Sequence, residues 1–445
     1  MVYQGTLIKK IKIILELLLR FGVILFLMIL FHKNKDAHEK GICKRGKMET
    51  IETTEAFKSL VEAIKQGEGY RDPLAFGICR VDVGQLNSDK VLQATYPVVN
   101  WNENFGSAAI FIEALREESV SIDFNADEVV CNVTLSFLEN CLKAFTPYSD
   151  EAYGDAHKNI QVISALYRQI KEDGMREGEF RIVFLFNDGA CQSVEATYLK
   201  LYALSLAKVP LRGINLNGAF GALPNVAWSD GNPIELDWLR AYEIELKFAN
   251  EYPHIDFVDK FPRFLQHIIP ADNTRILETS KVRFGAQLHA GTTVMPGASY
   301  INFNAGTTGV SMVEGRISSS AIVGDGSDVG GGASILGVLS GTDGNPISVG
   351  KNSLLGANSV CGIPLGDACI IDAGIAILEG TKITISEDQL KKIQAANPDH
   401  KIEGKVFKGK ELAGLNGLHF RQNSMTGEIT ASRSTREIKL NADLH

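Results

Sequence analysis

Two charged side chains, Glu314 and Arg316, stand alone in a long neutral stretch of the sequence. No other Asp, Glu, Lys or Arg occurs between Phe284 and Gly324, where the polar residues are mainly Asn, Thr and Ser. A partly buried carboxylate can act as a general base. A guanidinium can hold a substrate carboxylate through two parallel hydrogen bonds. The same two residues could form a plain surface ion pair, and their composition leaves both interpretations open.

The run Gly330–Ser334 reads Gly-Gly-Gly-Ala-Ser and is a second place where a ligand could bind. Such small side chains let a ligand approach the backbone closely. Free amides here suit an extended pantetheine arm better than a phosphate, which usually binds at a helix start. A turn that needs glycine is the alternative. His289 is the one histidine between Lys281 and Gly380, and it is more readily explained as a turn or surface residue than as a base.

These residues lie in a glycine repeat with a period of six. Of the 42 glycines, 20 fall between Lys281 and Gly380. After one slip and one insertion the phase returns, and the residue before each glycine is often apolar. The pattern predicts a parallel β-helix in which three six-residue units complete a triangular coil. One position of each unit should be aliphatic and point inward, and the corner should need a small residue that tolerates tight backbone geometry.

The flanking segments predict ordinary secondary structure. Upstream, helices are expected over residues 54–67, 160–170, 194–206 and 236–252, and a buried strand over 182–186. Downstream, Ser386 and Gln389 predict a capping box at the start of a short helix. We therefore expect an α+β chain in four parts. These are a basic apolar extension (1–47), an α/β N-terminal domain (48–278), the β-helix (279–383) and a C-terminal region (384–445).

The composition favours a folded enzyme over a nucleic-acid-binding protein. The 445 residues are 45% hydrophobic and 22% charged, with a formal net charge of −8. This charge argues against a chain built to bind nucleic acid. Seven cysteines occur without a Cys-x-x-Cys pair, and no Cys/His cluster has zinc spacing. The sequence therefore predicts reduced thiols in a cytosolic protein.

The first 47 residues differ from the rest of the chain. They carry a charge of +7, which leaves −15 on the remainder. Their uninterrupted apolar run, Phe21–Phe31, has 11 residues and is too short to span a bilayer, and no small-residue cleavage site follows. Our preferred hypothesis is that the assigned start is too long and that Met48 is the initiator. A membrane-associating helix, effective only if residues 1–47 are expressed, and a structural helix within the fold are the alternatives.

The repeat resembles a known family. The stretches INFNAGTTGVSMVEGRISSSAIVGDGSDVGGGASILGVLSG and ISVGKNSLLGANSVCGIPLGD are similar to tetrahydrodipicolinate N-succinyltransferases of the longer, actinobacterial and proteobacterial type. The similarity covers about Val282–Thr381 and, more weakly, the tail KGKELAGLNGLHFRQNS. It implies a left-handed β-helix and succinyl transfer from succinyl-CoA to the amino group of ring-opened tetrahydrodipicolinate, on the diaminopimelate route to lysine. It also implies a homotrimer with each active site between neighbouring β-helices, which would act in the cytoplasm that the cysteine content predicts.

The resemblance also implies roles for individual residues. Glu314, in the motif MVEGR, matches the family's catalytic carboxylate, which acts as a general base or carries the acyl group as an anhydride. We favour the base, because an amine only has to lose a proton to attack a thioester. Asp372 stands where glutamate is expected, and Lys408 and Arg421 suit CoA phosphates. The positions that match succinyl-CoA contacts are Arg316, Gly331, Ser334, Ala357, Asp372, Ala373, Gly380, Lys408, Arg421, Gln422, Asn423 and Ser424.

No metal is expected. Some relatives bind magnesium on the trimer axis through two carboxylates, and the matching positions here are Lys281 and Ala298. Two further hypotheses about function stay open beside the succinyltransferase. One is a hexapeptide acyltransferase that uses acetyl-CoA or acts on another amine. The other is a non-catalytic trimeric β-helix that binds a partner or a membrane.

Overall fold

The structure, a computed structural model, describes residues 48–152, 157–172, 177–338, 344–435 and 440. Residues Glu49–His445 form one compact unit. The extension expected at residues 1–47 lies outside the described residues, and the three hypotheses about it stay predictions. Within the described ranges, no helix combines the length and the apolar character that crossing a membrane requires.

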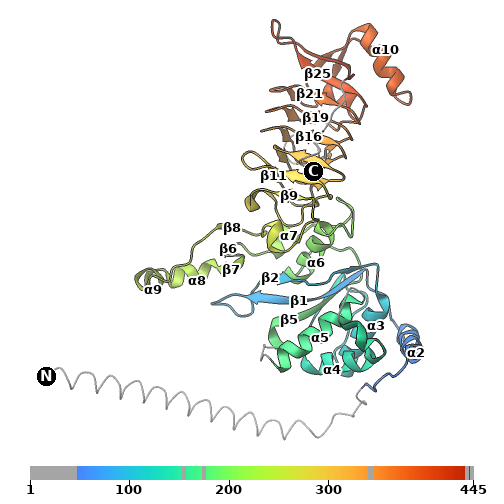
Figure 1. Cartoon of the computed structure of the whole chain (residues 1–445), viewed down its shortest axis with the longest axis vertical. Helices are drawn as coiled ribbons and strands as arrows, with labels where there is room; N and C mark the ends of the chain where they lie inside the picture. The colour runs from blue at the N-terminus through green and yellow to red at the C-terminus, as the bar shows by residue number, and fades with distance from the viewer. Residues whose placement is uncertain (1–47, 153–156, 173–176, 339–343, 436–439, 441–445) are drawn as a thin grey trace, which may run out of the picture. The chain divides into compact units, whose positions relative to one another are not determined.

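A mixed α/β arrangement forms the N-terminal part of this unit. Its central sheet has the order β2-β1-β5-β4, with β3 also paired to β1, and its pairings are antiparallel. Figure 1 shows α3, α4 and α5 gathered on one side of this sheet and α6 on the other. The elements are α2 (Thr54–Lys65), β1 (Ala75–Val83), β2 (Val91–Thr95), β3 (Asn100–Trp101), α3 (Phe105–Glu117), β4 (Glu128–Asn132), α4 (Leu135–Ala144), η1 (Thr146–Ala152), α5 (Lys158–Lys171), η2 (Glu177–Glu179), β5 (Phe180–Leu185) and α6 (Val194–Ser205).

Most of the expected helices are present. The sequence leaves Thr53 and Thr54 as possible caps of α2, and Thr53 is the cap, accepting a hydrogen bond from the Ala56 amide at 3.1 Å. The helix expected over residues 236–252 is wrong in one respect, because it breaks at Tyr242 into two short helices. The elements between α6 and the β-helix are α7 (Ala219–Ala222), β6 (Val226–Ser229), β7 (Asn232–Glu235), α8 (Leu236–Ala241), α9 (Glu243–Ala249), β8 (Phe257–Asp259), η3 (Phe264–Gln266), β9 (Arg275–Ile276) and η4 (Thr279–Lys281).

The glycine repeat folds into the expected parallel β-helix, visible as a ladder of short strands in Figure 1. Three faces stack in parallel register: β9, β10, β13, β16, β19 and β21 on the first, β11, β14, β17, β20 and β22 on the second, and β12, β15 and β18 on the third. The inward position is buried in every coil, and it is aliphatic or cysteine except in β12, where it is Thr307. Its strands are β10 (Thr292–Val294), β11 (Tyr300–Ile301), β12 (Gly306–Thr307), β13 (Ser311–Val313), β14 (Arg316–Ile317), β15 (Ile322–Val323), β16 (Ser327–Val329), β17 (Ser334–Ile335), β18 (Ser348–Val349), β19 (Leu354–Leu355), β20 (Val360–Cys361), β21 (Ile370–Ile371) and β22 (Ala376–Ile377).

Many corner positions require glycine because the next coil leaves no room for a Cβ atom, and not because the backbone adopts a conformation that only glycine favours. Gly324 and Gly356 do not have left-handed backbone angles, so tight geometry is not the reason for glycine there. A Cβ added at Gly356 would lie 2.5 Å from the Ala373 amide nitrogen of the next coil. Gly324 faces the Gly350 carbonyl carbon in the same way, at 2.7 Å. The period of six therefore reflects the close stacking of one coil on the next.

The substitution Gly324→Ala should destabilise the coil by about 3 kcal/mol, because the added methyl group meets backbone that cannot move independently. Gly380→Ala is the matched control, since a Cβ at Gly380 has nothing within 4 Å. Urea unfolding of both variants measures the difference. Equal midpoints for the two variants would show that stacking does not select glycine.

The C-terminal region continues the first face of the β-helix. β25 pairs in parallel with β21, and β26 then joins β25 to β23. The predicted capping box is wrong. Ser386 precedes the helix but its side chain makes no cap, and the Gln389 side chain accepts a hydrogen bond from the Arg433 amide at 2.9 Å. The elements are β23 (Lys382–Thr384), α10 (Glu387–Ala396), β24 (Val406–Lys408), η5 (Gly409–Leu412), β25 (Leu418–Gln422) and β26 (Ile429–Arg433).

Arg212 connects the N-terminal part to the β-helix. Its guanidinium donates to the Ser320 carbonyl at 2.6 Å and to the Ile347 carbonyl at 2.7 Å. The same group donates to the Ser348 hydroxyl at 3.0 Å. One hydrophobic core also continues from Ala75 to Ala431. Because this core is continuous, it offers no break with which the domain boundaries expected from the sequence can be compared, and those boundaries stay a prediction.

A buried histidine in this core makes folding sensitive to acid. His267 packs against the Phe284 ring, its Nδ1 lies 2.7 Å from the Tyr202 hydroxyl, and burial lowers its pKa to about 3. Unfolded histidine takes up a proton near pH 6.5, so stability contributed by the neutral ring falls as pH drops from 6.5 toward 3. Between pH 7 and pH 5 this residue alone should account for a loss of about 2 kcal/mol.

Urea unfolding at both pH values tests this, with His267→Gln as the comparison. We expect the variant to be less stable at pH 7 and to lose less stability on acidification than the parent. An unchanged dependence on pH in the variant would contradict the assignment.

Candidate active site on one corner of the coil

The corner between the first and second faces gathers most of the residues expected at the site. Each strand of the first face ends at this corner, and rungs of backbone hydrogen bonds align the residues that follow. Glu314 donates to the Val329 carbonyl at 2.8 Å, Gly356 to the Ile371 carbonyl at 2.7 Å, and Asp372 to the Phe420 carbonyl at 3.1 Å. The resulting column contains Glu314, Gly330, Gly356, Asp372 and Arg421.

The length of this column can be derived from strand spacing. Neighbouring strands lie about 4.8 Å apart, so the four steps from Glu314 to Arg421 cover roughly 19 Å. Gly331, Ala357 and Ala373 follow the column residues directly in sequence, and Ala357 and Ala373 are exposed. The corner therefore offers a track of Gly and Ala residues with the Glu314 carboxylate at one end and the Asp372–Arg421 ion pair at the other.

Glu314 is half-buried, and its carboxylate has no side-chain partner among the described residues. Two residues, Glu314 and Gly315, connect β13 to β14, whereas four residues connect β16 to β17 in the next coil. This longer loop contacts Glu314, whose carbonyl accepts a hydrogen bond from the Gly332 amide at 3.2 Å. Gly331 lies there, and a Cβ at Gly331 would be 3.5 Å from Glu314 Oε2. The backbone of Glu314 is thus fixed by hydrogen bonds to the next coil, while its carboxylate oxygens stay open to accept a proton.

Arg316 does not pair with Glu314, so the hypothesis of a plain surface ion pair between them does not describe this site. β14 and β17 place Arg316 directly beside Ser334. The guanidinium donates to Ser334 Oγ from Nε at 3.1 Å and from Nη2 at 2.6 Å. Arg316 and Ser334, both expected to contact succinyl-CoA, therefore lie together, and no described residue accepts a hydrogen bond from Nη1.

The remaining expected residues lie at the C-terminal end of the track. Gly380 precedes β23, in which Lys382 pairs with Lys408 of β24, and Gly380 and Lys408 are both exposed. Gln422 and Asn423 use their side chains within the turn that follows β25. The Gln422 amide donates to the Gly427 carbonyl at 3.1 Å, and Asn423 Oδ1 accepts from the Met425 amide at 2.9 Å. Ser424 lies exposed in the same turn.

Other residues considered from the sequence lie elsewhere. His289 is exposed at the corner between the third and first faces, and its amide donates to Thr307 Oγ1 at 3.1 Å. Lys281 donates to the Gly297 carbonyl at 2.7 Å, beside the exposed Ala298. No group of three or more His, Cys, Asp or Glu residues within the described ranges could hold a metal ion. The absence of a metal requirement stays a prediction.

His419 was missed by the sequence analysis. It is 7% exposed, and its Nε2 lies 2.8 Å from Asp372 Oδ1. A usable signal existed: residues two apart in a strand share a face, so His419 shares the face of Arg421 within β25.

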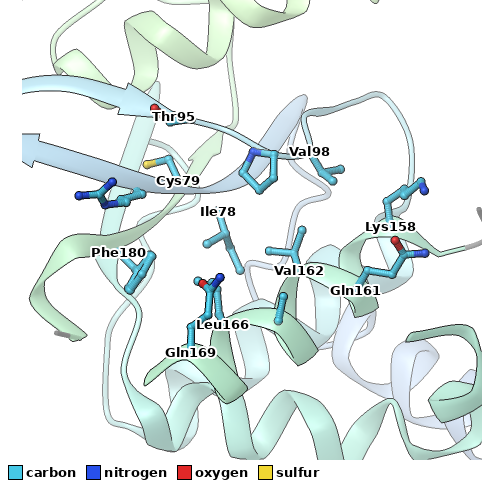
Figure 2. A pocket seen from close by; sticks show the side chains of 13 residues that line it. Ile78, Cys79, Thr95, Val98, Lys158, Gln161, Val162, Leu166, Gln169 and Phe180 are labelled. Carbon is cyan, nitrogen blue, oxygen red and sulfur yellow. The ribbon is translucent and has the colours of Figure 1, made fainter. Parts of the chain in front are cut away.

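A separate cavity of about 700 Å³ lies between α5 and β1 in the N-terminal part. Figure 2 shows Ile78, Val162 and Phe180 turned toward it, with Lys158 and Gln161 at one side. No residue expected at the active site lines this cavity.

Comparisons with known proteins agree with the repeat and extend to the N-terminal part. Profiles described as tetrahydrodipicolinate N-succinyltransferase N-terminal and middle match residues 55–221 and 223–263. A third, described as hexapeptide repeat of succinyl-transferase, matches residues 346–379. The N-terminal half carries no motif that is recognisable from the sequence alone, so these matches extend the family resemblance to that half.

Full-length relatives show the same relationship. A 2,3,4,5-tetrahydropyridine-2,6-dicarboxylate N-succinyltransferase from Sulfurimonas denitrificans is 72% identical over 399 residues, which cover 89% of this chain and all of the relative. One from Helicobacter pylori is 52% identical, covering 87% and 99%. A crystal structure of a Campylobacter jejuni protein described as a 2,3,4,5-tetrahydropyridine-2-carboxylate N-succinyltransferase is 58% identical, with a TM-score of 0.83, covering 88% of this chain and 100% of that one. The chain therefore belongs to the tetrahydrodipicolinate N-succinyltransferase family.

Proposed function

We propose that this enzyme transfers the succinyl group of succinyl-CoA to the amino group of tetrahydrodipicolinate in its open form, 2-amino-6-oxopimelate. This is the acyltransferase step that the relatives' names describe, within diaminopimelate and lysine biosynthesis. The observation that carries the proposal is the track from Glu314 to Arg421. A carboxylate, a row of small residues and a terminal cation follow one another there, in the order that a thioester, a pantetheine arm and a phosphate would need.

Each end of the track has a defined chemical task. The substrate amine attacks the thioester carbonyl and forms the new amide bond, while the carbon–sulfur bond breaks and releases CoA as its thiol. Glu314 accepts the proton that the amine loses, which its unpartnered carboxylate allows, and returns it to the departing sulfur, so that CoA leaves as its thiol. Arg316 has a free Nη1 to hold the carboxylate of the succinyl group. The acyl-anhydride role of Glu314 remains the alternative.

The opposite end suits the phosphates of CoA. Lys382 and Lys408 occupy paired positions in β23 and β24, where like charges repel unless an anion lies between them. Arg421 ends the column nearby, with its side chain 61% exposed. These cations provide local attraction for an anionic donor on a chain whose formal net charge is −8.

We further propose a homotrimer in which neighbouring β-helices form each active site. The track runs along an outer corner, and Ala357, Ala373, Gly380 and Lys408 are exposed. A convex corner cannot enclose a ligand by itself, whereas a second copy beside it would supply the other wall. The six described cysteines are free thiols, in keeping with a cytoplasmic enzyme. Light scattering on the purified protein tests the trimer, and a monomer at assay concentration would contradict it.

Release of free CoA thiol provides the test of the reaction. We expect release that depends on both succinyl-CoA and tetrahydrodipicolinate, with far less from acetyl-CoA. Turnover with acetyl-CoA and none with succinyl-CoA would favour the hexapeptide acetyltransferase hypothesis. Failure to bind CoA at all would favour the non-catalytic β-helix.

A further inference from the structure

Three side chains, those of His419, Asp372 and Arg421, contact one another at the C-terminal end of the track. His419 Nε2 lies 2.8 Å from Asp372 Oδ1, and Arg421 Nε lies 3.6 Å from Asp372 Oδ2. Asp372 thus uses one oxygen for the imidazole and the other for the guanidinium. His419 Nε2 is also 3.2 Å from Arg421 Nε, but a nitrogen that donates its proton to Asp372 cannot accept another from Arg421. The carboxylate is therefore the link between the two.

The three residues differ strongly in exposure along this chain. The side chain of His419 is 8% exposed, that of Asp372 42% and that of Arg421 61%. β21 and β25 pair in parallel, so Asp372 and Arg421 follow the partners Ile371 and Phe420. From the interior outward, the three groups are therefore a buried imidazole, a partly exposed carboxylate and an exposed guanidinium. Among the described residues, none accepts a hydrogen bond from the terminal nitrogens of Arg421, so both can donate outward.

We propose that His419 is a positioning residue for the donor: by fixing Asp372, it orients the Arg421 guanidinium so that both terminal nitrogens face a phosphate of CoA. This inference rests on the proposed function and adds a residue to the same site. A guanidinium recognises phosphate through two parallel hydrogen bonds, which only one orientation of its plane permits. A carboxylate in an ion pair on the Nε side, here at 3.6 Å, favours that orientation, provided that the carboxylate itself is held.

The geometry also explains how a carboxylate can lie beside an anion site. Asp372 Oδ1 is hydrogen-bonded to His419 and Oδ2 forms an ion pair with Arg421, so its charge is balanced within this cluster instead of facing the ligand. Without His419, Asp372 could turn and take Arg421 with it. The consequence would be weaker binding of the nucleotide end of CoA, with little change at Glu314, which is four coil steps away.

The experiment measures the Kd of CoA and the steady-state constants for succinyl-CoA in His419 variants. His419→Leu should raise the Kd of CoA and the KM for succinyl-CoA about tenfold, the size expected for one weakened charge-assisted hydrogen bond, with kcat within about twofold. His419→Gln, whose amide nitrogen can reach Asp372, should restore most of the binding. His419→Asn is too short to reach and should behave like His419→Leu, which preserves the test if the leucine variant folds poorly.

Succinyl-pantetheine, which lacks the nucleotide and its phosphates, is the decisive control. Parent and His419→Leu should use it with equal kcat/KM, because Arg421 has no phosphate to bind. A loss with succinyl-pantetheine as large as that with succinyl-CoA would indicate a general structural defect and overturn the proposal. An unchanged Kd for CoA in His419→Leu would overturn it as well.

The outcomes separate this inference from the proposed function. If the parent transfers the succinyl group and His419→Leu binds CoA normally, the function stands and the positioning role is wrong. If the parent binds CoA with the expected dependence on His419 but transfers no succinyl group, the positioning role stands and the reaction is wrong.

Discussion

Replacing Glu314 by glutamine is expected to lower kcat about a thousandfold, the middle of the range for loss of a general base. Glutamine has the same size and shape but cannot accept the proton of the attacking amine at neutral pH. The KM for succinyl-CoA should stay within about twofold, because the proposed donor contacts lie elsewhere on the track. The fold should be unaffected, since the carboxylate has no side-chain partner among the described residues. The CoA thiol assay under steady-state conditions measures both constants.

Glu403→Gln is the matched control for this prediction. Glu403 is 72% exposed, and its one ion pair among the described residues is with the more exposed Lys401, at 3.0 Å, so its loss should leave turnover unchanged. Full activity in Glu314→Gln would remove Glu314 from the mechanism. Mass spectrometry of enzyme quenched during turnover distinguishes the two roles of Glu314: a succinylated enzyme would support the anhydride, and its absence the base.

The largest effect on stability is expected at Lys200, which is buried in α6. Its ammonium group donates to Asp188 Oδ1 at 2.8 Å, to the Gly189 carbonyl at 2.6 Å and to the Asn215 carbonyl at 2.8 Å. All three protons are thus used, and two loops are held to one helix. Lys200→Met should cost about 3–5 kcal/mol, because it leaves Asp188 and two carbonyl groups without their partner. Urea unfolding at pH 7 measures this loss.

Lys247→Met is the control, because it removes a lysine of the same kind from an exposed helix. Lys247 pairs with Glu243 at 2.6 Å, but both side chains are more than half exposed, so the loss should be below about 1 kcal/mol. If the two variants unfold at similar urea concentrations, the buried ammonium group is not the link between these loops. The double variant Lys200→Met/Asp188→Asn should recover part of the stability, since it also removes the charge left unpaired.

A distant segment decides the polar contacts of two local motifs. Asn187-Asp188-Gly189, which the sequence alone makes most simply a turn, is held by Lys200 and Asn215. Ser386 and Gln389 have the spacing of a capping box, but Gln389 binds the Arg433 amide across the C-terminal region. The first motif carries no prediction of a partner. The second predicts the start of α10 correctly and the partner of Gln389 wrongly, because polar side chains satisfy whichever group the tertiary structure brings near.

The repeat by itself determined the β-helix and pointed to Glu314. Every six-residue unit must bury one aliphatic side chain and let the next coil approach, so the same two constraints recur along the sequence and can be read from it. The tertiary structure alone decided which residues share the corner. Arg421 joins Glu314 on the track because β25 adds to the first face after β21, and His419 meets Asp372 across the same pairing. That pairing joins segments 47 residues apart, and no local period encodes the register between them.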